Sequence, residues 1–255
     1  MPAPETIIRA AFLLAVALLA LGVVLSLAGR RRATGISLVL FLLASTVFFL
    51  NRAWMKNFFP FTDKVESFMT LAVLIVLCAL YYRSRIANRE FTTLLLLALA
   101  AAATIFAFED RIRYPTAYLL TLWYPLHVPL SFAAYAFWLV AGVNALFSLR
   151  AWRARDPSLQ ERPLMTDLNR NGFLCFTVAM LFGGIWGYLA WGAYFMWDPK
   201  LVWSAMLWLY YGNLLHLDGL PALRRWNIPL YILGVVMILI TFIGTGFFTR
   251  SIHKF

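Results

Sequence analysis

The feature that most constrains this chain is a series of long apolar runs that carry almost no charge. A bilayer core about 30 Å thick is crossed by a helix of about 20 apolar residues. Only 13% of the residues are charged and 63% are hydrophobic, whereas soluble domains average about 25% charged and about 45–50% apolar residues. We therefore predict an all-α, polytopic membrane helix bundle of about eight transmembrane helices. The expected spans are about 7–28, 36–52, 66–82, 91–108, 128–149, 171–190, 201–217 and 228–248, of which the second and seventh are short.

The distribution of Lys and Arg among the loops predicts which face each loop occupies. One set of alternate loops holds 13 of these residues and the other set holds 9. Cytoplasmic loops are enriched in Lys and Arg, so we expect the richer set in the cytoplasm. Its loops are 29–35, 83–90, 150–170 and 218–227.

The remaining loops and both termini are then expected on the outer, periplasmic or extracellular side. These loops carry Arg52, Arg111 and Arg113, for which solvation at the surface is expected. The net charge of +11 is scattered among loops and forms no basic stripe. Because a nucleic-acid site needs such a stripe, we expect no nucleic-acid partner.

The densest signal is an aromatic segment at 183–211, which holds five of the ten tryptophans. Tryptophan and tyrosine collect at membrane–water boundaries, so an ordinary interfacial belt is one interpretation. The segment also contains four glycines, which permit tight turns or close approach of a flat partner. Asp198-Pro199 should break the chain ahead of the next helix, whose dipole favours an acidic residue there. Such a rigid aromatic surface suits a large planar amphiphile.

The chain has only three histidines, and two of them are expected beside the aromatic segment. His127 should open the fifth span, and His253 follows the eighth, so both are expected at the outer boundary. A histidine at a helix end is often a solvated or capping residue, but two on one face fit axial ligation of haem iron. Lys200 and Arg250 suit the haem propionates, although interfacial snorkelling also explains such cations.

The third histidine, His216, lies sixteen residues after Lys200. A helix rising about 1.5 Å per residue would carry it about 24 Å toward the opposite face. Ionisable groups within membranes are costly and usually functional, whereas a position near the cytoplasmic boundary would leave His216 solvated. We predict that His216 ligates iron at a second, inner site, where the other ligand must come from a partner subunit, a second copy of the chain or a non-histidine residue.

The aromatic segment resembles the tryptophan-rich "WWD" motif of the haem-handling proteins of cytochrome c biogenesis. The likeness extends over about 120–255, and it is best to the CcsA (ResC) type, with CcmC and CcmF as relatives. Phe195 and Leu201 depart from the common pattern, which leaves the subgroup open. The resemblance implies axial haem ligands at His127, His253 and His216, and propionate contacts at Lys200 and Arg250. The residues that it implies for binding the macrocycle are Trp186, Trp191, Gly192, Tyr194, Trp197, Asp198 and Trp203.

The resemblance also implies a function and an organisation of the chain. Residues 1–110 would form a four-helix membrane region and 111–255 the haem-handling region. The protein would bind haem b non-covalently, as substrate or transported ligand, at the periplasmic side of the bacterial inner membrane. It would present this haem to the CxxCH motif of apocytochrome c, as the membrane part of a holocytochrome c synthase (haem lyase) that acts with a Ccs1/ResB-like subunit.

Three alternatives stay open at this point. The first is delivery of haem to a chaperone, as implied for CcmC-like proteins. The second is a quinol-linked respiratory subunit with b-type haem, for which three histidines offer only a poor facing pair. The third is a transporter for an unrelated solute, although the two halves show no convincing internal repeat.

Overall fold

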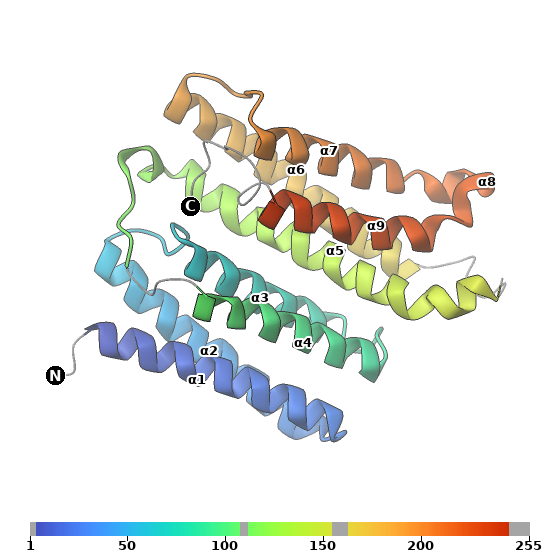
Figure 1. Cartoon of the computed structure of the whole chain (residues 1–255), viewed down its shortest axis with the longest axis horizontal. Coiled ribbons are helices and arrows are strands. Elements are labelled where there is room, and N and C mark those ends of the chain that lie inside the picture. Colours follow the sequence, from blue (N-terminus) through green and yellow to red (C-terminus); the bar gives the residue numbers. More distant parts are fainter. Residues whose placement is uncertain (1–3, 108–111, 155–162, 245–255) are drawn as a thin grey trace. The chain divides into compact units, whose positions relative to one another are not determined.

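The computed structural model describes residues 4–107, 112–154 and 163–244, among which there are helices, turns and loops but no strand. Figure 1 shows the long helices. The all-α prediction is confirmed. The α-helices are α1 (Pro4–Leu27), α2 (Arg31–Lys56), α3 (Lys64–Tyr81), α4 (Asn88–Ala103), α5 (Trp123–Arg153), α6 (Pro163–Trp191), α7 (Pro199–Leu214), α8 (Pro221–Arg224) and α9 (Asn227–Leu239), and α9 continues as a short π-helix, η5 (Ile240–Gly244).

Each predicted span corresponds to one helix of the described part of the chain, with only the four-residue α8 left over. Six helices are long and apolar enough to cross a bilayer, whereas α4 and α7 have 16 residues each. The second span, predicted to be short at 36–52, is the 26-residue helix α2. Its ends carry charged residues, which hydropathy assigns to loops. The chain is a helical membrane protein.

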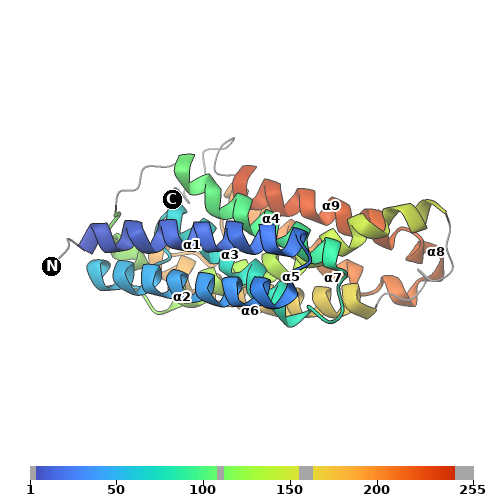
Figure 2. The same cartoon turned by 90° about the horizontal axis from the view of Figure 1, so that it is seen from below.

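The chain divides into two units, Met1–Pro125 and Leu126–Phe255. In the first unit, α1 packs along α2 and α4, and α3 packs against α4; Figure 2 shows α1 lying along α2. The chain turns between α1 and α2 within three residues because Gly29 has a φ of +70°, a conformation that glycine adopts readily. Ser37 of α2 donates a hydrogen bond of 2.6 Å to the Leu18 carbonyl of α1.

A buried ion-pair network joins the end of α2 to the start of α3. Arg52 donates to the carboxylates of Asp63 and Glu66 at 2.7 Å each, and Lys56 bonds to the same two acids. The second oxygen of Glu66 accepts the backbone N–H of Thr62 at 2.8 Å. The expectation that Arg52 is solvated at the surface is therefore wrong. Its guanidinium tolerates complete burial because two acids oppose it.

The ion-pair network shifts the pKa of the Asp63 carboxyl group. Asp63 precedes α3 and lies outside the membrane spans. Burial alone would raise the pKa of its carboxyl, but the charges of Arg52 and Lys56 outweigh burial and hold that pKa below its ordinary value. Arg113 is exposed, as predicted, and Arg111 lies outside the described residues.

An aromatic and amide core fixes the helices of the second unit. Trp138 of α5 and Tyr211 of α7 stack with ring centroids 3.8 Å apart and planes 2° apart. Asn169 of α6 accepts the Trp138 indole N–H at 3.1 Å and donates to the Tyr211 carbonyl at 3.0 Å. A Cβ on Gly172 would lie 2.5 Å from the Trp138 indole nitrogen, so only glycine allows this approach. The core thereby sets the positions of α6 and α7, whose connection is the aromatic loop.

Candidate functional site

The aromatic loop, residues 192–198, joins α6 to α7 and is fixed at both ends by backbone chemistry. Gly192 has a φ of +74°, which residues with a side chain rarely adopt. At the other end, the Asp198 carboxylate accepts the backbone N–H of Lys200 at 3.0 Å and caps α7. Pro199 occupies the start of α7, where its missing N–H costs nothing. The predicted break at Asp198-Pro199 is confirmed.

Aromatic rings surround this loop and the last two turns of α6. Trp186 and Trp191 meet edge to face with centroids 4.8 Å apart, and Tyr188 stacks on Tyr194 at 4.6 Å with planes 12° apart. Trp186 is 4% exposed, whereas Trp197 is 89% exposed. The loop therefore combines a packed aromatic base at Trp186 with rings that remain largely exposed, of which Trp197 is the most exposed.

His127 lies in the second turn of α5, against α6. Its Nδ1 is 2.7 Å from the Ala179 carbonyl oxygen, and its ring lies nearly parallel to that of Trp186, with centroids 6.4 Å apart. A Cβ on Gly183 would lie 2.6 Å from the same Nδ1. Gly183 thus leaves the space that the imidazole occupies, and Ala179 and Trp186 define its orientation.

The hydrogen bond to Ala179 assigns the protons of His127. A carbonyl oxygen only accepts, so Nδ1 must carry the proton in this bond. In the neutral imidazole, Nε2 then has the free lone pair, which is the form that ligates metals. Neither Ala179 nor the role of Gly183 was predicted from the sequence. A backbone carbonyl has no sequence signal, and Gly183 stood out only as one of four glycines in the aromatic segment.

Lys200, the cation predicted beside the aromatic loop, is removed from water to an extent that is uncommon for a lysine. Lys200 is the second residue of α7, ahead of the predicted span 201–217. It is partly buried, and burial lowers the pKa of its ammonium group to about 8, although Asp198 opposes this shift. Trp203, one turn along α7, is partly buried.

The remaining predicted ligands are not brought to His127 by the described residues. Arg250 and His253 lie outside the described residues. His216 follows the end of α7, at the opposite end of that helix from Asp198. It is exposed in a turn, where its backbone N–H donates to the Asn213 carbonyl at 3.1 Å. The helix predicted to carry His216 through the membrane thus ends at Leu214, before reaching it.

One tryptophan of the aromatic segment has a packing role instead. Trp208 stacks on Phe173 of α6 with centroids 5.5 Å apart, and its indole N–H donates to the Thr177 hydroxyl at 2.9 Å. These contacts join α6 to α7 within the helices, away from the loop. The aromatic residues therefore form two groups: those such as Trp208 that pack α6 against α7, and those that are exposed in the loop between these helices.

The family model described as Cytochrome C assembly protein matches residues 6–253. The chain belongs to this family. Its resemblance to the CcsA-type proteins of cytochrome c biogenesis is thereby confirmed at the level of the family, and the protein takes part in cytochrome c maturation.

Individual relatives agree with the family match. The cytochrome c biogenesis protein CcsA of Prochlorococcus marinus (strain NATL1A) is 26% identical over 266 aligned positions, which cover 84% of this chain and 84% of that protein. Protein NrfI of Wolinella succinogenes is 27% identical over 221 positions, which cover 82% of this chain but only 24% of NrfI. This chain therefore spans about a quarter of the length of NrfI.

A solved structure has the same fold. The cytochrome c haem lyase CcmF matches 98% of this chain with a TM-score of 0.75, and the match covers 48% of the CcmF chain. The sequence identity is 18%. At this level the likeness establishes the helical fold and carries nothing about activity.

Proposed function

We propose that this protein binds haem b non-covalently on the periplasmic side of the bacterial inner membrane and presents it to the CxxCH motif of an apocytochrome c. Haem is here the substrate. His127 and His253 are its axial ligands, and the aromatic loop holds the macrocycle. One observation carries the proposal: the bond from His127 Nδ1–H to the Ala179 carbonyl, which leaves Nε2 as the ligating nitrogen.

The surroundings of His127 suit a porphyrin better than a bare metal ion. Within the described ranges, no three His, Cys, Asp or Glu side chains converge as a metal site. Haem iron takes four ligands from the porphyrin and needs only axial ligands from protein. The Trp186–Trp191 pair lies beside His127, and the exposed rings of Tyr194 and Trp197 extend the apolar surface. These features support Trp186, Trp191, Gly192, Tyr194, Trp197, Asp198 and Trp203 as the loop that binds the macrocycle.

Lys200 is the cation that the described residues offer to a propionate, and Arg250 is proposed as a second one. An ammonium group that burial destabilises gains when an anion approaches it, because a charge-assisted pair offsets the loss of water. Asp198 has a different role from its neighbours, since its carboxylate caps α7 and fixes the loop. It acts on the macrocycle by positioning the loop.

For the attachment of haem to apocytochrome c, the proposed contribution of this chain is to position the haem and not to react with it. Each apocytochrome thiol adds across one haem vinyl group: sulfur bonds to one vinyl carbon, and hydrogen is added to the other. This addition consumes no oxidant, but the thiols must arrive reduced. The chain has no CxxC of its own to reduce them. His127 and the aromatic loop therefore contribute orientation, leaving an edge of the haem open to the peptide. The histidine of CxxCH then replaces one protein ligand and releases the product.

His216 is proposed as a ligand at a second haem position, at the other end of α7 from the aromatic loop. Its exposure in the turn after α7 leaves the imidazole accessible to a substrate or a partner. The chain has no fourth histidine, so the second axial ligand must come from elsewhere. A Ccs1/ResB-like membrane subunit is the proposed partner, and residues 1–110 are proposed as the membrane region separate from haem handling.

The test is the absorption spectrum of the full chain purified with its co-expressed partner. His127→Ala should remove most of the Soret absorbance assigned to the outer site and abolish maturation of a reporter cytochrome c. His216→Ala is the matched control: it changes the same residue type at the other end of α7 and should spare the outer-site signal.

Retention of both the Soret band and reporter maturation in His127→Ala would overturn the outer haem site. A haem that quinol reduces, in a protein whose deletion leaves cytochrome c intact, would instead support a respiratory subunit. Release of haem to a soluble chaperone, without attachment to apocytochrome, would place the chain with the CcmC-like proteins.

A further inference from the structure

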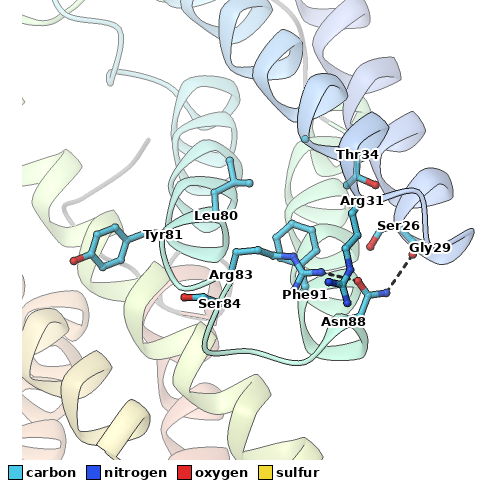
Figure 3. Close-up of a pocket in the computed structure, with 11 residues that line it drawn as sticks. Ser26, Gly29, Arg31, Thr34, Leu80, Tyr81, Arg83, Ser84, Asn88 and Phe91 are labelled. Carbon is cyan, nitrogen blue, oxygen red and sulfur yellow. Dashed lines mark hydrogen bonds between the residues drawn. The ribbon is translucent and has the colours of Figure 1, made fainter.

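A basic pocket lies in the first unit, at the end opposite the buried ion-pair network. It is bounded by the turn between α1 and α2 and by the loop between α3 and α4, and its volume is about 470 Å³. Figure 3 shows two arginines that reach toward Asn88, Arg31 from the start of α2 and Arg83 from the loop that follows α3. Gly29 and Gly35 border the pocket, and a Cβ on either would meet open space.

The pocket holds two positive charges and no negative one. None of its lining residues is acidic. Arg83 is held in place by a 2.8 Å bond to the Asn88 side-chain oxygen and lies over the Phe91 ring, 4.4 Å from its centroid. Asn88 in turn donates to the Ser26 carbonyl at 3.3 Å. The guanidinium of Arg83 is therefore positioned by other side chains, with Arg31 as its charged neighbour.

The guanidinium groups of Arg31 and Arg83 repel one another unless an anion binds to both of them. Partial burial and, second, the charge of Arg31 lower the pKa of Arg83 below its ordinary value. The helix termini add to the positive potential. α2 begins at Arg31 and α4 at Asn88, and neither helix has a side-chain cap at its start. The positive ends of the two helix dipoles favour an anion at this end.

We propose that this pocket binds a phosphate-bearing anion, and that its physiological occupant is the headgroup of an anionic phospholipid. The two guanidinium groups match phosphate oxygens by charge and by bidentate geometry. Two apolar side chains from the end of α3, Leu80 and Tyr81, also line the pocket, and Tyr81 is 80% exposed. A headgroup can bind the arginines while its acyl chains lie along these side chains. Basic pockets between membrane helices bind anionic headgroups by the same means.

This inference is independent of the proposed haem site, because every residue of the pocket belongs to the first unit. The test measures lipid retained by the purified full chain. Protein is exchanged from nanodiscs of phosphatidylcholine with 30% phosphatidylglycerol into detergent, and bound lipid is counted by native mass spectrometry. Arg31→Gln/Arg83→Gln should reduce retained phosphatidylglycerol at least about tenfold, since charge-assisted bonds are the stronger class of hydrogen bond.

Arg32→Gln/Arg89→Gln is the matched control. Both residues are exposed and do not line the pocket; Arg32 directly follows Arg31, and Arg89 lies six residues after Arg83. This control removes the same amount of charge from the same end of the unit. If the pocket holds the lipid, and not general surface charge, the control should change lipid retention less than about twofold. Because Arg83 also orders the loop, Arg31→Gln alone is the second variant: Arg31 is exposed, and its loss should leave folding intact while weakening retention.

A second arm separates the two sources of phosphate. Inorganic phosphate is added to delipidated wild-type protein and to Arg31→Gln, and thermal unfolding is followed. Stabilisation of the wild type alone would support a pocket that takes free phosphate, whereas retention of phosphatidylglycerol without a phosphate effect supports the lipid. Equal lipid retention and equal phosphate response in wild type, pocket variants and control would overturn the proposal.

Discussion

Two loops of this protein share a construction but differ in what they expose. Residues 57–63 join α2 to α3, and residues 192–198 join α6 to α7. Each begins with a left-handed residue, Asn57 at φ +47° and Gly192 at φ +74°, and each ends with an aspartate that caps the next helix. The same local rules of turn and cap therefore build both connections.

The side chains around these loops have opposite roles. Around the first loop, two cations and two acids close a network with little or no solvent access. Around the second, aromatic rings remain exposed on a packed base. Exposed aromatic surface costs free energy unless a partner covers it, whereas the buried network opposes each of its two cations with both acids. The comparison predicts a stabilising role for the first loop and supports the proposed binding role of the second.

The largest expected effect is on stability, at the first loop. Glu66→Ala should lower the free energy of unfolding by about 3–5 kcal/mol, because Arg52 and Lys56 are left buried without one of their two acids. Unfolding in mixed micelles, followed by circular dichroism, measures this change. The counterpart at the second loop is Trp197→Ala, which should change stability by less than about 0.5 kcal/mol because this ring is exposed. Equal losses in the two variants would contradict the comparison.

The second effect concerns binding and uses two adjacent glycines of α6. Gly183→Ala places a Cβ 2.6 Å from His127 Nδ1, so the imidazole must move from its bond with Ala179. Haem binding should weaken by about 10–100-fold, as for other groups that orient a metal ligand. Gly184→Ala is the control, because its Cβ would meet the Tyr194 carbonyl oxygen at an ordinary 3.7 Å. Haem titration of both variants checks this, and similar affinities would remove Gly183 from the site.

A smaller effect is expected at the cap of the second loop. Asp198→Ala removes the acceptor of the Lys200 backbone N–H and should cost about 0.5–2 kcal/mol of stability. Asp198→Asn keeps an acceptor oxygen and should recover most of that loss. Thermal unfolding of the two variants gives the comparison. A loss as large as that of Glu66→Ala would mean that the second loop also carries a network on which the fold depends.

The smallest effect at ordinary pH is the titration of Asp63. The folded pKa of this carboxyl lies below its ordinary value, so its stabilising contribution is complete above the unfolded pKa of about 3.9. It is lost as the pH falls through the lower, folded pKa. Stability of the wild type should thus decline steeply in acid. Asp63→Asn should flatten that decline, and an unchanged acid profile in Asp63→Asn would exclude this carboxyl as its cause.

The helices were predictable because their signal is local. Apolar runs located every span, and the Asp-Pro dipeptide located the start of α7. The ends of α2 were missed because Arg52 and Lys56 resemble loop charges in a hydropathy reading. Their burial depends on Asp63 and Glu66, which lie up to fourteen residues further along the chain, at the start of another helix. Pairing of this kind has no periodic signature.

The candidate site was predictable in its residue types and not in its contacts. The tryptophans, the glycines and His127 were identified by their density and spacing. The contact that orients His127 comes from the carbonyl of Ala179, 52 residues away, and any residue at that position presents the same group. The end of α7 ahead of His216 was also missed, because the residues from Leu215 to Leu217 are as apolar as the helix apart from the histidine itself.

The central claim is that Nε2 of His127 ligates haem iron because Nδ1 donates to Ala179. The most direct measurement replaces His127 with glycine in the full chain and adds imidazole to the haem-loaded protein. The account predicts that His127→Gly loses the bis-histidine Soret and α bands, that imidazole restores them, and that His216→Gly shows neither change. Retention of the bis-histidine spectrum in His127→Gly before imidazole is added would contradict it.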